Sequence, residues 1–331
     1  MKIKIDELNE LVGTVLQKQG YSSEESKIIT EVLMYAQLRG NNQGVVKLIG
    51  LGIPKSSDAG EVEIEKERNI SAFFNAHQKQ AMLVMHQVVD VAIRKAKEHG
   101  VGLVGIRGIN TSSGALGFYA KKIADAGLVG IVCAGSMETV AAHGSSEAVF
   151  GTNPIAIGVP ANGNPLVFDM TTAAMAFFGV VEAATAGQHL PGDIAFDKQG
   201  QPTTLPQDVL DDGALKSFDG SHKGSGLAMM VQALTGPLMG AYFTGFGDVV
   251  KNWGGHFILA FDPELFVGLE ATQKGVTQMI EKVKSTRKLS GLEEIFVPGE
   301  RGNRLTDQAL SSGEIEIEDN LYAELNKAAG L

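Results

Sequence analysis

The chain has 331 residues, a formal net charge of −10 and 44% hydrophobic residues, so it can bury the core of one or two ordinary globular domains. The acidic balance without a basic patch argues against a nucleic-acid partner, and no stretch reaches the about 18 apolar residues of a membrane helix. We therefore expect a cytoplasmic protein with no membrane partner. The one cysteine, Cys133, lies in an apolar stretch, where we expect a buried and unreactive thiol.

Two amphipathic helices are expected at the start of the chain. Apolar residues recur at helical spacing over residues 8–16 and again over 28–36. Ser22 and Glu25 have the spacing of a capping box that begins the second helix, and Gly40 predicts its end.

Helices and strands then alternate along the chain. The apolar patterns predict helices over residues 78–98, 113–126 and 223–240, and strands over 101–106, 128–134, 155–160, 165–168 and 256–261. Such alternation indicates an α/β fold. Residues 187–216, rich in Gly, Pro and Asp, indicate a long surface excursion.

Common catalytic and cofactor motifs are absent. No GxGxxG sequence follows a predicted strand, and the chain has no Walker A sequence and no GxSxG sequence. The seven histidines are scattered without the spacing of metal ligands, so we expect no metal site. From motifs alone, the chain is either an α/β enzyme or a binding protein.

Six segments, in order along the whole chain, together resemble the malate/L-lactate dehydrogenase family of nicotinamide-dependent oxidoreductases. They are Leu38-Arg39-Gly40, Gly151-Thr152-Asn153-Pro154, Phe168-Asp169-Met170-Thr171-Thr172, Pro202-Thr203-Thr204, His222-Lys223-Gly224-Ser225-Gly226-Leu227 and Val297-Pro298-Gly299-Glu300-Arg301. Each segment alone is a weak signal, and their order makes the combination specific.

The resemblance implies an α/β fold that is not of the Rossmann type, which explains the missing glycine fingerprint. Its central sheet is mixed and largely antiparallel, as in the L-sulfolactate dehydrogenase-like fold. An N-terminal helical unit of residues 1–70 would pack with the C-terminal segment 285–331, and residues 71–284 would form the sheet domain with both binding sites. The resemblance also implies a homodimer. Met229 and Met230 are compatible with its interface, but core positions are the commoner explanation for such residues.

The resemblance further implies NAD or NADP as cofactor. The residues that match the family's cofactor contacts are Ser136, Thr152, Asn153, Asp169, Thr171, Lys223 and Gly224. Hydroxyl, amide and carboxylate groups can bond ribose and carboxamide. Lys223 opens a predicted helix, where its ammonium and the free backbone amides could meet a pyrophosphate.

The sequence departs from the family at the residues that handle the substrate. Gln43 stands where the family has its proton-donating His, and Lys47 replaces an Arg that binds the substrate carboxylate. Ser112 stands where a second His is usual. A carboxamide cannot give up a proton, so His143, followed by Gly144, is a candidate substitute, and His222 and His256 are others.

Three functions remain open at this point. In the first case, the chain is an oxidoreductase of small 2-oxo and 2-hydroxy acids, rebuilt around Gln43, Lys47 and Ser112. Alternatively it reduces a cyclic imine carboxylate, because a protonated imine needs no further acid. In the third case it binds the cofactor but has lost catalysis. In the first two, the partner is a small-molecule carboxylate.

Overall fold

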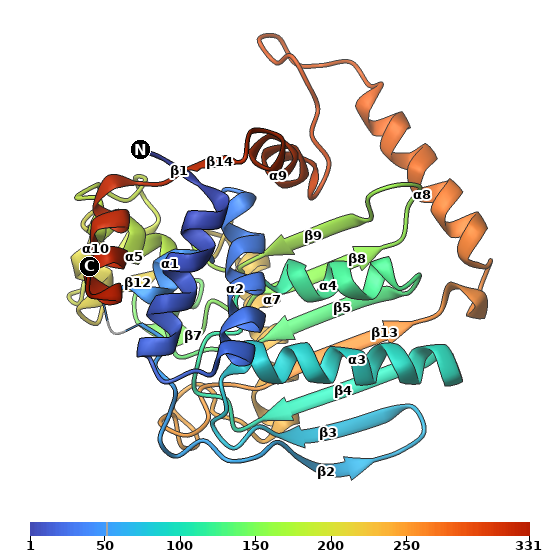
Figure 1. The fold of residues 1–331 in the computed structure, drawn as a ribbon, viewed down its shortest axis with the longest axis horizontal. Helices are drawn as coiled ribbons and strands as arrows, with labels where there is room; N and C mark the ends of the chain where they lie inside the picture. The colour runs from blue at the N-terminus through green and yellow to red at the C-terminus, as the bar shows by residue number, and fades with distance from the viewer. Residues whose placement is uncertain (51) are drawn as a thin grey trace.

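The computed structural model describes residues 1–50 and 52–331 and is built around a seven-stranded mixed sheet (Figure 1). The strands lie in the order β2-β3-β4-β13-β5-β8-β9. Only β3 and β4 pair in parallel, so the expected α/β fold with a largely antiparallel sheet is confirmed. The bounds are β2 (Glu63–Glu67), β3 (Ser71–Asn75), β4 (Val101–Arg107), β13 (His256–Phe261), β5 (Val129–Ala134), β8 (Ile155–Val159) and β9 (Leu166–Met170).

Strand β13 occupies the centre of this sheet although it comes late in the chain. All six of its residues pair antiparallel with β4 on one side and with β5 on the other. The alternating burial of β13 places His256, Ile258 and Ala260 in the interior. A predicted strand therefore proves to be the one that joins the two halves of the sheet.

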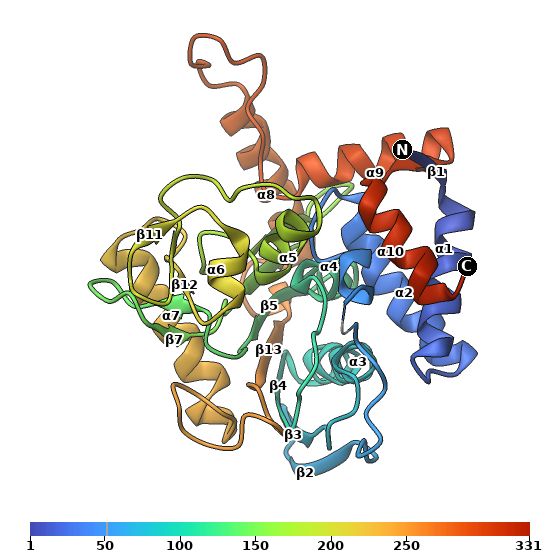
Figure 2. The ribbon, with the colours of Figure 1, turned by 90° about the vertical axis from the view of Figure 1, so that its left-hand side faces the viewer.

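Helices cover both faces of the sheet. Helices α3 (Ala81–His99) and α4 (Leu116–Asp125) lie on one face, and α7 (His222–Thr235) lies on the other (Figures 1 and 2). Two strand glycines allow the close approach of the first two. A Cβ on Gly102 would lie 2.0 Å from the carbonyl oxygen of Ala92, and a Cβ on Gly158 would lie 2.2 Å from that of Ala120.

Segments from the two ends of the chain pack together. Helix α1 (Ile5–Lys18) contacts α10 (Asp319–Ala329), and both α1 and α2 (Ser23–Leu38) contact the short helix η1 (Val45–Leu48). Strand β1 (Lys2–Lys4) pairs with β14 (Glu314–Glu316). The capping box is confirmed, because Ser22 and Glu25 each accept a hydrogen bond from the other's backbone N–H. The division into units at residues 70 and 285 stays a prediction, since β2 and β3 pair across residue 70.

The expected surface excursion over residues 187–216 is wrong. This segment folds into a small lobe whose interior holds Leu190, Ala195, Val209 and Leu215, all buried. Its strands of two or three residues are too short to produce a readable apolar pattern. The elements of the lobe are β6 (Val140–Ala141), β7 (Ala148–Phe150), α5 (Phe177–Thr185), β10 (Ala195–Phe196), β11 (Pro202–Thr203), α6 (Pro206–Leu210) and β12 (Ala214–Leu215).

Helix α8 (Leu269–Lys284) and the loop after it stand out from the body (Figure 2). None of its residues is buried. The salt bridges of Lys284 with Glu294 and Glu300 link its end to α9 (Glu300–Ser312). Short 3₁₀ turns, η2 (Pro237–Met239) and η3 (Pro263–Leu265), precede and follow β13.

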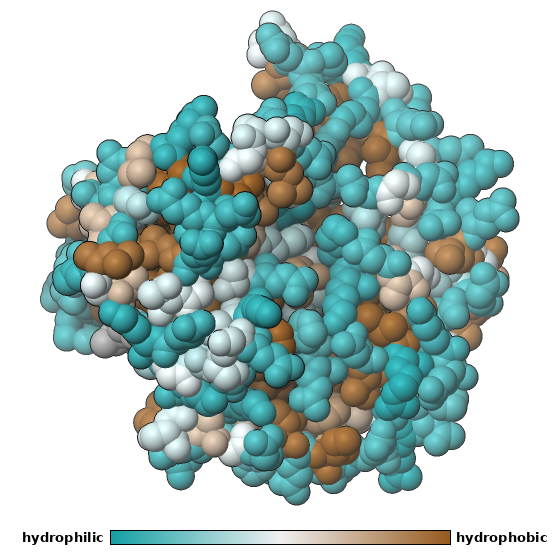
Figure 3. Space-filling model, viewed as in Figure 1, coloured by the Kyte–Doolittle hydropathy of each residue, from teal (hydrophilic) through white to brown (hydrophobic). Residues whose placement is uncertain are grey.

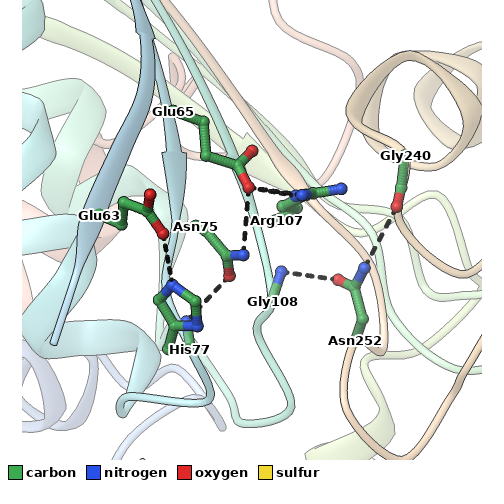
Figure 4. A network of polar contacts seen from close by, with 8 residues as sticks. All are labelled: Glu63, Glu65, Asn75, His77, Arg107, Gly108, Gly240 and Asn252. Carbon is green, nitrogen blue, oxygen red and sulfur yellow. Dashed lines mark hydrogen bonds and ion pairs between the residues drawn. The ribbon is translucent and has the colours of Figure 1, made fainter. Parts of the chain in front are cut away.

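A polar network holds the ends of β2, β3 and β4 together (Figure 4). Glu65 accepts hydrogen bonds from Asn75 and Arg107, and His77 contacts Glu63 at 3.0 Å. Asn252 accepts from the N–H of Gly108 at 2.9 Å, which fixes the loop that leads into β13. The network therefore positions that loop against the end of β4.

Polar side chains cover most of the face drawn in Figure 3, with apolar side chains in separate small groups. Among the described residues, no helix has the length and apolar character needed to cross a membrane. Cys133 is 1% exposed, and burial raises the pKa of its thiol to about 12, which confirms the expected unreactive cysteine.

We predict that Gly158→Ala lowers the free energy of unfolding by about 3 kcal/mol or more, because the new Cβ meets the backbone of α4. Chemical denaturation would measure the loss. Gly163→Ala is the matched control, since Gly163 has a φ of 85° but open space around it, and should cost only roughly 1 kcal/mol. Equal losses would mean that helix packing does not depend on this glycine.

Candidate active site

A cleft of about 870 Å³ opens where the strands β4, β5, β9 and β13 meet the small lobe. Its lining comes from both terminal regions, the sheet and α5. Among the predicted site residues it brings together Gln43, Lys47, Ser112, Ser136, Thr152, Asp169 and Thr171. Residues from distant parts of the sequence thus share one cavity, as the family resemblance implies.

The segment with Gln43 and Lys47 is folded back against α2. Gly40 has a φ of 63°, a conformation that suits glycine and ends the helix. The side chain of Gln37 then accepts a hydrogen bond from the N–H of Val45 at 3.1 Å. The turn η1 that follows carries Lys47 into the cleft.

Lys47 is buried without a polar partner. Its side chain is among the largest that are fully buried, and its Nζ makes no hydrogen bond among the described residues. Its Nζ lies over the ring of Phe178, 3.4 Å from the ring centroid. Burial holds the pKa of Lys47 well below its usual range, because the ammonium form has lost its water.

Lys95 shows how the chain treats a buried lysine elsewhere. It is 3% exposed, yet its Nζ donates to the carbonyl of Arg68 at 2.7 Å and pairs with Glu67 at 2.9 Å. A structural lysine in this protein is therefore paired, and Lys47 is not.

Three residues predicted to bind the cofactor form a hydroxyl-rich wall of the cleft. The hydroxyl of Ser136 accepts from the N–H of Thr152 at 3.0 Å, and the hydroxyl of Thr171 donates to the carbonyl of Thr152 at 2.8 Å. These bonds join the ends of β5, β8 and β9. Within the described residues, the Thr152 hydroxyl has one hydrogen-bond partner, Ser136 at 3.4 Å, and so can still bond a ligand.

Asp169 lies at the same wall and also caps α4. Its carboxylate accepts a hydrogen bond from the N–H of Gly117 at 2.7 Å. Burial raises the pKa of Asp169 to about 6, while the Gly117 bond and the positive charge of Arg39 act in the opposite direction. Asp169 is consequently a carboxyl group that can change protonation near neutral pH.

Four of the predicted residues do not line the cleft. The Asn153 side chain is fully buried and donates to the carbonyl of Ala228 and to the side chain of Gln232, both on α7. Lys223 and Gly224 lie in the first turn of α7. His143 is exposed beside the start of α7, with its ring 6.2 Å from that of His222.

The backbone amides at the start of α7 already have acceptors. Asp219 accepts from the N–H groups of Ser221 and Gly224, and the Ser221 hydroxyl accepts from the N–H of Lys223. Hydrogen bonds from Ser221 hold the pKa of Asp219 below its usual range. A phosphate at this helix start would have to displace a carboxylate, so only the Lys223 ammonium remains exposed for it.

Of the histidines considered as substitutes for the missing proton donor, His256 lines the cleft, and His143 and His222 do not. His256 is 1% exposed, and both of its ring nitrogens lack a partner among the described residues. Burial lowers the pKa of His256 to about 4, so its imidazole is neutral. Its place at the start of β13 was expected, but the cavity beneath that strand end was not.

Aromatic and cationic side chains complete the lining. Phe177, Phe178, Phe218, Trp253 and Tyr35 carry no motif, and only the fold brings them together. Arg39 and Arg301 also line the cleft and belong to segments that resemble the family. With Lys47, three basic side chains face one carboxyl group, an arrangement that attracts a small anion to an acidic protein.

Comparisons with known proteins agree with this arrangement. Residues 3–326 match the model of a family described as malate/L-lactate dehydrogenase. The chain is 34% identical to the malate/(S)-sulfolactate dehydrogenase of Methanothermus fervidus, over 99% of this chain and 97% of that protein. It is 30% identical to the Δ1-pyrroline-2-carboxylate/Δ1-piperideine-2-carboxylate reductase of Pseudomonas putida, over 97% of this chain and 95% of that protein.

A solved structure extends the likeness to the fold. The malate dehydrogenase of Pyrococcus horikoshii superposes with a TM-score of 0.85 at 29% identity, covering 99% of this chain and 95% of that one. The similarity therefore includes the terminal helices and the small lobe as well as the sheet.

We predict that Lys47→Met raises the free energy of unfolding by about 1–3 kcal/mol at neutral pH, because it removes a buried amine that nothing pairs. The folded chain binds this proton less tightly than the unfolded chain. The destabilisation by Lys47 therefore grows as pH falls from about 10, and so should the gain from Met. Denaturation at several pH values measures both effects.

Lys95→Met is the matched control, since it leaves Glu67 and the carbonyl of Arg68 without their partner. It should lower stability rather than raise it. A loss of stability in Lys47→Met comparable to that in Lys95→Met would show that Lys47 serves the fold.

Proposed function

The chain belongs to the malate/L-lactate dehydrogenase family, and we propose that it transfers a hydride between a nicotinamide cofactor and a small 2-oxo or 2-hydroxy acid. The observation that carries this proposal is the unpaired, buried Lys47 amine in a cleft with a hydroxyl-rich wall. The chain maintains this amine at a cost in stability, which is typical of a functional group.

The residues present fit a nicotinamide cofactor. The cleft of about 870 Å³ is large enough for the reactive part of a dinucleotide, and its walls offer the hydroxyls of Ser136, Thr152 and Thr171. The neutral His256 imidazole has two unused nitrogens that can bond a carboxamide or a substrate oxygen. When bound, the cofactor would supply or accept the hydride. The cofactor would be NAD or NADP.

The substrate end of the cleft is the basic one. Lys47, Arg39 and Arg301 would attract a carboxylate, and Gln43 can donate a hydrogen bond to it. Ser112 is less free, because its hydroxyl accepts from the N–H of Gly114 and its carbonyl accepts from Gln80. We therefore assign substrate contact first to Lys47 and Gln43.

One observation favours a second substrate class. Gln43 stands in the cleft where the family resemblance implies a proton-donating His, and the lining imidazole of His256 is neutral. A protonated cyclic imine carboxylate becomes a neutral amine on hydride addition and needs no acid. The similarity to an imine reductase supports the same alternative.

We expect the purified protein to bind NADH or NADPH and to reduce at least one 2-oxo acid or cyclic imine carboxylate. Cofactor binding would be followed by the change in cofactor fluorescence. Turnover of a panel of oxo acids, hydroxy acids and cyclic imines would be followed by the nicotinamide absorbance.

Thr152→Val is the variant that tests the site, because it removes the free hydroxyl and keeps the shape and the backbone bond to Ser136. It should weaken cofactor binding roughly tenfold. Thr14→Val, on an exposed face of α1, is the control and should change nothing. Cofactor binding without turnover of any compound would mean that the protein binds the cofactor but has lost catalysis. Binding of neither cofactor would refute the proposal.

We further propose that the protein is a homodimer. Large apolar side chains are exposed on one side of α7 and on α8, among them Met229 and Met230, each 61% exposed, and Met279, 51% exposed. A core position for Met229 and Met230 is therefore wrong. Exposed apolar groups of this size suit a protein interface.

Light scattering at micromolar concentration should give twice the 35.0 kDa mass of one chain. The double variant Met229→Glu, Met230→Glu should shift the mass toward that of the monomer, because it places charges in the apolar surface. Gln199→Glu, on an exposed loop, is the control for added charge. A monomeric wild-type protein would contradict the proposal.

A further inference from the structure

The Lys47 amine is the group of the cleft that the proposed reaction leaves unexplained. An anchor for a carboxylate needs a positive charge, and an arginine keeps its charge in any surroundings. Burial against Phe178 without an acceptor instead makes the Lys47 amine release its proton readily. The chain thus holds a dissociable proton where a simple anchor needs none.

The charged groups around Lys47 do not neutralise it. Arg39 and Arg301 line the same cleft and carry charges of the same sign, and Asp169 already bonds Gly117. Glu182 lies on α5, which packs against η1. None of them forms an ion pair with Lys47 among the described residues, and burial alone causes its shift.

Other lining groups are less suited to donate a proton. The guanidinium groups of Arg39 and Arg301 do not release theirs, and the Gln43 carboxamide has none to give. Burial raises the pKa of Tyr35 to about 12, and the neutral His256 holds its remaining proton tightly. Asp169 is the one competitor, and its carboxylate is engaged with α4.

We propose that Lys47 is the proton donor for reduction of a 2-oxo acid and the proton acceptor for oxidation of a 2-hydroxy acid. This assignment rests on the proposed function. The carboxylate and the C2 oxygen of a 2-oxo acid are neighbours, and an ammonium has three N–H donors. One ammonium can therefore hold the carboxylate and also face the oxygen that needs the proton.

The step balances without another reactant. In reduction the C=O π bond breaks, C2 gains the hydride that the nicotinamide supplies, and the oxygen takes a proton from Nζ. The amine is left neutral and regains a proton from water. In oxidation, the neutral amine takes the hydroxyl proton as C2 loses its hydride. The negative charge of the bound carboxylate favours the ammonium form of Lys47, so substrate binding itself leads to protonation of the donor.

The decisive variant is Lys47→Arg, which keeps the charge and cannot release a proton. We expect it to retain binding of oxamate, an unreactive 2-oxo acid analogue. Its kcat for 2-oxo acids should fall roughly 10²–10⁴-fold, the usual contribution of a general acid. Reduction of a cyclic imine should fall less. We expect the kcat of the wild-type protein to depend on pH and this dependence to disappear in Lys47→Arg.

Two controls separate Lys47 from other causes. Lys95→Arg makes the same change at a buried, paired lysine and should leave kcat and its pH profile unchanged. Asp169→Asn keeps an acceptor for Gly117 and removes the competing acid. Loss of the pH profile in Asp169→Asn but not in Lys47→Arg would assign the proton to Asp169 and overturn the proposal.

A calorimetric titration with oxamate needs no turnover and uses the wild-type protein as well as the variants. Titration in two buffers of different ionisation enthalpy should show proton uptake that Lys47→Arg lacks. Absence of uptake in the wild-type protein throughout about pH 6 to 10 overturns the proposal, even if Lys47→Arg does not fold. Full activity of Lys47→Arg overturns only the Lys47 assignment. A wild-type protein inactive on every acid and imine overturns the proposed function as well.

Discussion

The site depends on one constraint of the sheet, which is that β13 must lie between β4 and β5. Those two strands do not pair with each other, and the edge of each that faces the other finds its hydrogen-bond partners in a segment much later in the chain. This insertion brings the loop with Trp253 and the first residue of β13, His256, to the floor of the cleft. The Asn252–Gly108 bond holds that loop against the end of β4. The cleft therefore depends on the pairing of β13 with both of its neighbours.

The local patterns of the sequence predict helices α1 to α4 and α7 and strands β4, β5, β8, β9 and β13, but not β2, β3, α9 or α10. The capping box of Ser22 and Glu25 and the apolar stripe of α3 need no knowledge of the rest of the chain. The small lobe could not be predicted, because its two-residue strands exist only through their neighbours. Helix α8 also escaped prediction, and it buries none of its residues in this chain. The positions of Gln43 and Lys47 in the cleft follow from a motif of the family.

The state of the site residues lay beyond sequence reasoning. That Lys47 is buried depends on where α5 places Phe178, and that His256 lacks partners depends on a cavity. Asp219 occupies backbone amides at the start of α7, because its carboxylate lies within hydrogen-bond distance of the N–H groups of Ser221 and Gly224. A basic residue at a helix start suggests an anion site, but the sequence does not tell whether the protein supplies its own anion. Lys47 and Lys95 make the same point, because identical side chains with similar burial differ entirely in their partners.

The projecting helix α8 is held to the rest of the molecule by few interactions, so its local stability differs from that of the sheet. It has no buried face within the chain, and its 16 residues only just exceed the about 12–15 residues below which an isolated helix is marginal in water. Its attachments here are the hydrogen bond between Asn162 and Thr277 and the ion pairs of Lys284. Exposed ion pairs weaken as salt rises. We therefore expect helix α8 to open locally at a lower free energy than the sheet. The amide hydrogens of α8 would exchange with solvent long before those of β13, because local opening of α8 leaves the cleft intact.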